Sequence, residues 1–260
     1  MSLINRIKYT NRYPHINKFL FFLKLLKKKE IKDRSLSELV KEFDMVSVLC
    51  SGPSLNKCIN EQNKTLFVTT NSSYLFLKNN DKFVHIIRDF GYLKKFLFFG
   101  LKYKPLLVII DIHTFENGKG LGGLCISYIK KYLGRVKLEY PVVITSSENN
   151  LPINMKNYSN DILEFMNSNK LKNPNNNSGL MIYGYGVWIT SNFNNLTHCN
   201  IYGLDAGEGG QKYFNGSNTL PNHVAMRNKN KKEMKVFIEN AQNKFPFIKN
   251  YSYFMNNVNN

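Results

Sequence analysis

A short loop, Ser51–Leu55, carries residue types suited to binding a phosphate group. It follows the apolar, β-branched run Met45–Cys50 and precedes a polar segment compatible with a helix. Gly52 lets a ligand approach the backbone closely, Pro53 fixes the turn, and the Ser54 hydroxyl is able to cap a helix or donate to a phosphate oxygen. The loop is therefore a candidate anion-binding site, with an ordinary tight turn as the alternative interpretation.

His223 is the histidine whose context best suits acid–base chemistry. The sequence places it in an irregular stretch, Leu220–Asn230, just ahead of a helix, and loops often carry catalytic groups. An imidazole titrates near neutral pH and is able to take a proton from a hydroxyl group. Packing or surface exposure is the alternative for His223, and it is the favoured interpretation for the other four histidines.

Two further glycine clusters are weaker candidates. Gly118–Gly123 lacks the Gly-Lys-Ser/Thr ending of a triphosphate-binding loop, so a mobile loop is the better interpretation. Gly203–Gly210 departs in spacing from a dinucleotide-binding fingerprint. We expect a strand that ends at the carboxylate of Asp205, followed by a flexible loop.

Strand-like runs alternate with helix-length segments along most of the chain. Besides the run before Ser51, the apolar and β-branched runs are Thr65–Thr70, Phe83–Ile87, Pro105–Ile112, Pro141–Thr145 and Asn200–Leu204. This alternation predicts an α/β fold, a mainly parallel, Rossmann-like sheet with helices on both faces. Ligands of such sheets bind beyond the carboxyl ends of the strands.

Beyond residue 33, three segments have the pattern of helices. They are Arg34–Phe43, the apolar run Gly179–Thr190 and the charged, amphipathic run Lys231–Ala241. Gly184 and Gly186 lower the helix propensity of the second segment, which indicates close packing against a neighbouring backbone or a ligand.

The N-terminal 44 residues form a separate basic segment. Within it, Asn17–Lys29 places Phe19, Phe22 and Leu26 at helical spacing among lysines. Such a helix suits docking onto an anionic membrane surface, or packing against its own domain or a partner subunit. The whole chain carries 36 Lys and Arg against 18 Asp and Glu, a formal charge of +18 that favours anionic partners.

The remaining composition indicates a folded protein of the cytoplasm. Hydrophobic residues make up 43% and charged residues 21% of the 260 positions, which excludes a disordered chain. The four cysteines form no CxxC pair and no zinc-ligand set with histidine, so we expect reduced, packed thiols. We find no secretory signal and no apolar run long enough for a membrane span, so only a peripheral position on the inner face of the plasma membrane is expected besides the cytoplasm.

Several motifs, taken in order, resemble those of the single-domain bacterial sialyltransferases of the Campylobacter lipooligosaccharide type. They are GPSL at Gly52–Leu55, TTNSSYLF at Thr69–Phe76, NSG at Asn177–Gly179, IYGLD at Ile201–Asp205, and a histidine ahead of the KNKKEMKVFIE helix. The resemblance spans roughly Met45–Ala241. It implies one nucleotide-binding glycosyltransferase domain, residues 45–260, of a GT-A variant type with a small lid around residues 206–230.

The family implies an enzyme that takes sialic acid or a related nonulosonic acid from its CMP ester, inverts the anomeric centre and needs no metal or other cofactor. The acceptor would be a hydroxyl group of a cell-surface glycan such as a lipooligosaccharide or capsule. By motif position, the nucleotide-binding residues would be Ser51, Gly52, Pro53, Ser54, Asn71, Asp89, Ser178, Gly179 and Asp205. Tyr213 would match a lid tyrosine that hydrogen-bonds the leaving phosphate, and His223 would be the general base.

Several features depart from the family's pattern. A second lid tyrosine is missing, with residues near Gly207 and Glu208 in its place, and the general-base histidine of the family falls closer to Arg227 or Asn228 than to His223. Cys50 stands where the first loop of the family usually begins with a further glycine. Arg88–Phe90 replaces an Asn-Pro-Ser segment after the third strand, which puts the acid Asp89 near the donor in place of an amide. The identity of the donor sugar is therefore left open.

Two other functions fit parts of the sequence. A nucleotide or pterin pyrophosphokinase-like enzyme of the same superfamily would use Asp89, Asp111 and Asp205 to hold magnesium. A non-enzymatic nucleic-acid-binding protein would use the positive charge and the 13% aromatic content, although the basic residues are spread along the chain. The transferase interpretation instead predicts a nucleotide-sugar donor, a glycan or glycolipid acceptor and no nucleic acid, and it leaves open whether the chain forms a homo-oligomer.

Overall fold

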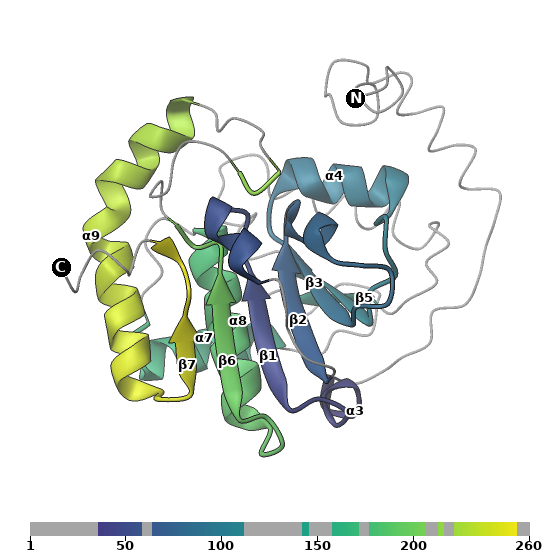
Figure 1. Cartoon of the computed structure of the whole chain (residues 1–260), viewed down its shortest axis with the longest axis horizontal. Helices are drawn as coiled ribbons and strands as arrows, with labels where there is room; N and C mark the ends of the chain where they lie inside the picture. The colour runs from purple at the N-terminus through teal and green to yellow at the C-terminus, as the bar shows by residue number, and fades with distance from the viewer. Residues whose placement is uncertain are drawn as a thin grey trace.

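The computed structural model describes residues 36–58, 64–111, 142–145, 158–171, 177–205, 213–215 and 221–253. Within these residues, one sheet has the strand order β5-β4-β3-β2-β1-β6-β7, and every adjacent pair is parallel (Figure 1). The strands are β1 (Met45–Leu49), β2 (Thr65–Thr70), β3 (Phe83–Ile87), β4 (Leu107–Asp111), β5 (Val142–Thr145), β6 (His198–Tyr202) and β7 (Ile248–Asn250). The predicted α/β class with a parallel sheet is confirmed.

Helical segments connect and cover these strands. They are α3 (Leu36–Val40), the 3₁₀ segments η1 (Pro53–Lys57) and η2 (Ser73–Phe76), α4 (Phe90–Phe99), α7 (Tyr158–Ser168), α8 (Ser178–Asn192) and α9 (Pro221–Lys244). Figure 1 shows α7 and α8 behind the sheet, with α9 beside its β7 edge.

The direction in which the chain crosses the sheet reverses at β1. From β1 the chain moves outward through β2, β3, β4 and β5, and it then returns so that β6 pairs on the other side of β1. Met45 accordingly lies opposite Thr65 of β2 and opposite His198 of β6. The loops that follow β1 and β6 therefore meet at the carboxyl edge, which is where ligands of open parallel sheets bind.

Both faces of the central strands are buried, which explains why their sequences are apolar runs rather than alternating patterns. Val46 and Val48 belong to the main hydrophobic cluster, together with the buried residues of α8. Leu49 points to the opposite face, into a second cluster with Leu55 of η1 and Tyr74 of η2. Short 3₁₀ segments thus cover the second face close to the carboxyl edge.

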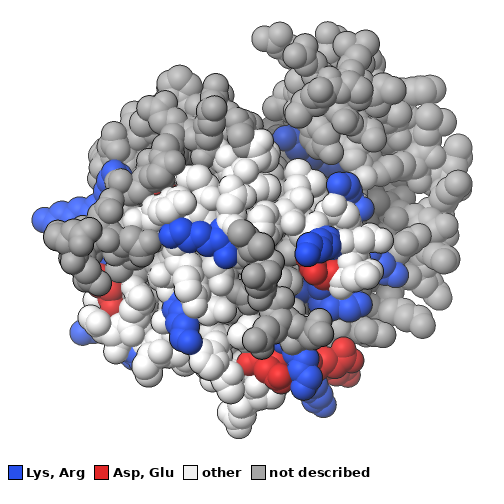
Figure 2. Space-filling model, viewed as in Figure 1, with Lys and Arg blue, Asp and Glu red and all other residues white. Residues whose placement is uncertain are grey.

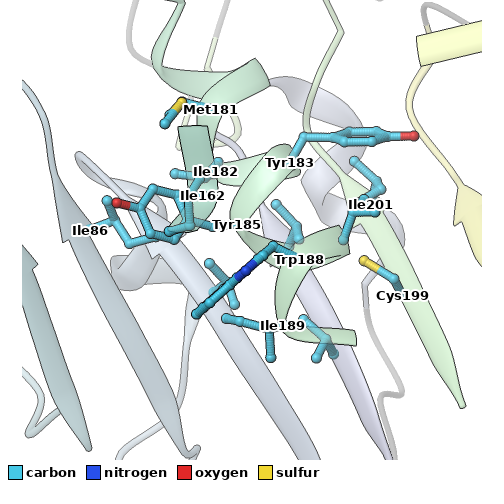
Figure 3. Packing of buried hydrophobic residues seen from close by; sticks show 14 of the residues in the cluster. Ile86, Ile162, Met181, Ile182, Tyr183, Tyr185, Trp188, Ile189, Cys199 and Ile201 are labelled. Carbon is cyan, nitrogen blue, oxygen red and sulfur yellow. The ribbon is translucent and has the colours of Figure 1, made fainter. Parts of the chain in front are cut away.

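The helix α8 packs closely against the sheet at Gly186 and against α7 at Gly184. A Cβ atom at Gly186 would overlap Val48 Cγ2 of β1, and one at Gly184 would lie 2.9 Å from Met166 Sδ of α7. Close packing at these glycines is confirmed, but the prediction that the neighbour is a backbone or a ligand is wrong, because the neighbouring groups are side chains. Figure 3 shows large α8 residues such as Tyr185 and Trp188 spread over the strands from this helix.

Several boundaries differ from the sequence-based expectations, and two of these differences concern candidate site residues. The last long helix begins at Pro221 rather than near Lys231, so His223 lies in the first turn of α9 and not in an irregular stretch. Proline fits the first helical turn, and the Asn- and Lys-rich residues that follow contain no helix breaker. The strand β6 begins and ends two residues earlier than expected, which places Asp205 beyond its end.

The described part of the N-terminal segment belongs to the main body. Leu36, Leu39 and Val40 of α3 and Phe43 after it lie in the main hydrophobic cluster, so the packed body begins before residue 45. The predicted amphipathic helix Asn17–Lys29 and the glycine cluster Gly118–Gly123 lie outside the described residues.

Charged side chains are dispersed on the face seen in Figure 2. Among the described residues, Lys and Arg side chains there lie at several separate places, some of them beside Asp or Glu side chains. No helix in the described ranges combines the length and the apolar character needed to cross a membrane.

Candidate functional site

The loops after β1 and β6 are joined by backbone hydrogen bonds. Cys50 N donates to Tyr202 O and Gly52 N donates to Gly203 O, each at 2.8 Å. Gly203 has φ +73, and a Cβ atom on it would overlap Cys50 O. Glycine is therefore required at position 203, because the backbone there has a positive φ and because the loops after β1 and β6 approach each other closely.

The carboxylate of Asp205 is held between the β1 loop and the C-terminal segment. It accepts hydrogen bonds from Ser54 N at 2.7 Å, from the Ser54 hydroxyl, and from Tyr253 N at 2.8 Å. Burial raises the pKa of Asp205, and its hydrogen bonds with Ser54 and Tyr253 together with the charge of Lys57 only partly offset that effect. Asp205 thus joins the loop after β6 to the loop after β1 and to the C-terminal segment, and these contacts form the buried floor of the site.

The C-terminal segment adds further contacts to the same floor. Leu204 N donates to Ser252 Oγ at 3.0 Å, and Lys57 Nζ donates to Tyr251 O at 3.2 Å. The Lys57 ammonium also lies 4.1 Å from the centre of the Tyr253 ring. Residues 251–253 therefore connect η1 to the end of β6.

These bonds change the role expected for the loop Ser51–Leu55. The N–H groups of Gly52 and Ser54 donate to the β6 loop, Leu55 N donates to Gly52 O, and Pro53 has no N–H to donate. The expectation that Ser54 caps a helix is wrong, because the N-cap of η1 is Gly52 and the Ser54 hydroxyl donates to Asp205. A contact of Ser54 with phosphate stays a prediction. Ser51, Gly52 and Pro53 are the half-buried residues of the loop, and of these Ser51 has a side-chain hydroxyl to offer.

Asn71 lies beside this loop at the end of β2. The register pairs Leu49 with Thr69, so the chain positions that follow them, Ser51 and Asn71, lie at the same level of the carboxyl edge. Asn71 has φ +53, a left-handed conformation that asparagine tolerates. Its Oδ1 atom is buried and has no hydrogen-bond partner. A buried acceptor without a partner is costly, so this atom suits a donor group on a ligand.

Tyr213 is brought to the site by its neighbour. Phe214 N donates to Ser51 O at 3.1 Å, and the Phe214 ring packs edge-on against Phe76, with centroids 6.0 Å apart. Burial raises the pKa of Tyr92 on α4, the nearby Tyr213 and Asp89 add to that increase, and a hydrogen bond with the Ser72 side chain opposes it. Tyr213, Tyr92 and Ser72 are therefore neighbours beside Asn71.

The N-terminus of α8 reaches the same edge from beneath. Asn177 is its N-cap, and the Asn177 Oδ1 atom accepts from Gly179 N at 2.8 Å and from Leu180 N at 3.1 Å. The Cys50 thiol donates to Gly179 O at 3.9 Å, and a Cβ atom at Gly179 would lie 2.7 Å from Leu204 Cδ1. Ser178 and Gly179 thus lie against the loops after β1 and β6.

The three aspartates proposed to hold magnesium are engaged separately. Asp111 Oδ2 accepts from Arg88 Nε at 2.8 Å in a buried ion pair, Asp205 binds Ser54 and Tyr253, and Asp89 caps α4 by accepting from Tyr92 N at 3.1 Å. Within the described ranges, no group of three His, Cys, Asp or Glu side chains gathers as a metal site would. The exposed Asp89 is the one of the three that faces solvent.

The structure therefore brings together most of the predicted residues. Half-buried Ser51, Asn71, Ser178, Gly179 and Tyr213 surround the carboxyl edge, with Ser54 and Asp205 beneath them. Only the backbone of His223 is described, in α9, so its role stays a prediction. Sequence reasoning did not assign Arg88, Tyr92 or Asn177 to the site, although an asparagine ahead of Ser-Gly and an apolar helix is a recognisable N-cap signal.

Comparisons with known proteins add no family assignment. The chain matches no protein-family model, no curated protein and no solved structure at a significant level. The resemblance to the sialyltransferases thus rests on the order of its sequence motifs.

Proposed function

We propose that the chain is a metal-independent, inverting glycosyltransferase that moves sialic acid or a related nonulosonic acid from its CMP ester to a hydroxyl group of a cell-surface glycan. The observation that carries the proposal is the meeting of Ser51, Asn71 and Tyr213 at one carboxyl edge, joined by the bond from Phe214 N to Ser51 O. Three chain segments far apart in sequence there offer hydroxyl, amide and phenol groups to one ligand.

Each of these groups has a place in binding the donor. The unpartnered Asn71 Oδ1 is an acceptor, so its ligand partner must be a donor such as a ribose hydroxyl or the cytosine amino group, and not a phosphate oxygen. The Tyr213 phenol and the Ser51 hydroxyl are donors, which suits the phosphate. Ser54 and Asp205 bind each other instead of the ligand, and they hold the two loops in position beneath it.

The reaction then requires a leaving group and a base. The acceptor oxygen forms a bond to the anomeric carbon while the bond from that carbon to the phosphate oxygen breaks, and its electron pair leaves on CMP. Tyr213 stabilises the charge that develops on this phosphate. His223 takes the proton of the acceptor hydroxyl.

Release of CMP from CMP-N-acetylneuraminic acid, with and without EDTA, tests the proposal. We expect release that continues in EDTA and that falls by about a hundredfold in Tyr213→Phe, the effect of losing one donor to the developing charge. Tyr103→Phe is the matched control, because Tyr103 precedes β4 and so lies toward the amino ends of the strands, away from the carboxyl edge. No release above the buffer rate by the wild-type chain would refute the proposal, and a strict need for magnesium would favour the pyrophosphokinase-like alternative.

A further inference from the structure

A buried ion pair joins three elements at the carboxyl edge. Arg88 follows β3 and Asp111 ends β4, and their side chains are 2% and 1% exposed with Arg88 Nε 2.8 Å from Asp111 Oδ2. Arg88 Nη1 also donates to the carbonyl oxygen of Asn177 at 3.5 Å. Arg88 thus connects two neighbouring strands to the residue that begins α8, 89 positions further along the chain.

Asn177 in turn organises the first turn of α8. Its side-chain oxygen accepts from the N–H groups of Gly179 and Leu180, and its carbonyl oxygen accepts from Met181 N at 3.0 Å. Whatever fixes Asn177 therefore fixes Ser178 and Gly179, which lie against the loops after β1 and β6.

Stability alone does not account for this arrangement. Removing two charges from water is costly, and replacing a buried ion pair by apolar residues of similar volume is often neutral or stabilising. A cation close to the N-terminus of a helix is also disfavoured by the helix dipole. A geometric role for the guanidinium, which holds a carboxylate and a carbonyl oxygen at the same time, explains why it lies there.

We propose that Arg88 is a positioning residue, which with Asp111 holds Asn177 in place and so orients Ser178 and Gly179 at the carboxyl edge. The consequence for nucleotide binding rests on the proposed function. The ordering of the first turn of α8 does not, so the two are measured separately.

The test compares the full chain with two variants. Arg88→Met combined with Asp111→Leu replaces the pair by apolar groups, and Arg88→Lys keeps the charge but loses the planar, forked donor group. We expect the double variant to unfold at nearly the wild-type temperature. The amides of Gly179, Leu180 and Met181 should exchange with deuterium on the order of tenfold faster, and CMP binding measured by calorimetry should weaken by a similar factor, the size expected for one hydrogen bond to a charged group.

Two controls locate the effect. Amides in the last turns of α8, at Ile189 and Thr190, should keep their exchange rates in the double variant. Lys235→Met combined with Glu239→Leu removes a half-exposed pair on α9, where Nζ and Oε1 are 3.7 Å apart, and should leave exchange in α8 unchanged.

Unchanged exchange at Gly179–Met181 in the double variant would overturn the inference. If the double variant does not fold, Arg88→Lys provides the test, because wild-type exchange rates at Gly179–Met181 in that variant would also overturn the inference. Failure of the wild-type chain to bind CMP would count against the proposed function alone, because the exchange rates would still test the positioning role.

Discussion

Ser54 donates two hydrogen bonds to Asp205, one from its backbone N–H and one from its hydroxyl, although 151 positions separate the two residues. These bonds join the loops that follow β1 and β6, the two neighbouring strands between which the strand order reverses. The Ser54 N–H and hydroxyl and the Asp205 carboxylate therefore bind each other, and they stabilise the contact between the two loops. Under the proposed function, the groups that contact the ligand would therefore be those of the half-buried Ser51, Asn71, Ser178 and Tyr213.

Ser54→Ala should lower the free energy of unfolding by about 1–3 kcal/mol, because the buried Asp205 carboxylate and Gly203 N lose a partner. Denaturation in urea measures the change. Ser191→Ala is the control, since the Ser191 hydroxyl donates only within its own helix, to Val187 O at 2.8 Å. Equal stability of the two variants would mean that the Ser54 hydroxyl is not a structural group.

Gly52→Ala should destabilise the chain, because its Cβ atom would overlap Asp205 Oδ2 and lie 2.5 Å from Gly203 O. The expected loss is about 1–3 kcal/mol, typical of overpacking at a site that is unable to relax. Gly91→Ala, whose Cβ would meet only Asp89 Oδ1 at 3.0 Å, is the milder comparison in the same assay. A Gly52→Ala variant as stable as Gly91→Ala would contradict the close contact between the two loops.

Asn71→Gly should separate stability from binding. Glycine adopts φ +53 without strain and removes a buried oxygen that has no partner, so the free energy of unfolding should stay equal or rise. CMP affinity should fall about tenfold, the loss expected for one hydrogen bond. Calorimetry and urea denaturation on the same preparation give both values. Wild-type affinity in Asn71→Gly would remove this residue from the site.

His85 should make the fold sensitive to acid. Burial in β3 lowers its pKa from 6.5 to about 3, so between these values the unfolded chain binds a proton that the folded chain does not. The free energy of unfolding therefore falls as the pH falls below 6.5, by about 1.4 kcal/mol per pH unit from this residue.

Comparison of variants isolates that contribution. His85→Gln keeps a polar group near Thr69 Oγ1, which lies 2.9 Å from His85 Nδ1, and should lose the pH dependence that His85 supplies. His198→Gln, at the partly exposed start of β6, controls for the loss of an imidazole. The same slope in His85→Gln and wild type would show that His85 does not titrate as a buried neutral group.

The central strands could be predicted from the sequence because both of their faces are buried. The runs Thr65–Thr70 and Phe83–Ile87 match β2 and β3 to the residue, since buried parallel strands are continuous apolar and β-branched stretches. β7 has only three residues, too few for a pattern. The start of α9 at Pro221 was missed because polar Asn and Lys residues conceal helical periodicity.

The site could be predicted only as far as topology dictates it. Parallel strands bring their carboxyl ends to one edge, so segments after β1, β2 and β6 had to be neighbours. The hydrogen-bond partners of Ser54 and Arg88 depend on the positions of residues far away in the sequence, Asp205 and Asp111. No local pattern reveals such pairs, and the role of the loop at Ser54 changes once they are known.

Deuterium exchange of the full chain with and without CMP tests the central claim most directly. CMP should slow exchange in the segments that contain Ser51, Asn71, Ser178 and Tyr213, and it should leave α7 and the β7 edge unchanged. Binding of CMP without protection at these four segments, or no binding at about 1 mM CMP, a concentration that detects even weak complexes, would contradict the account.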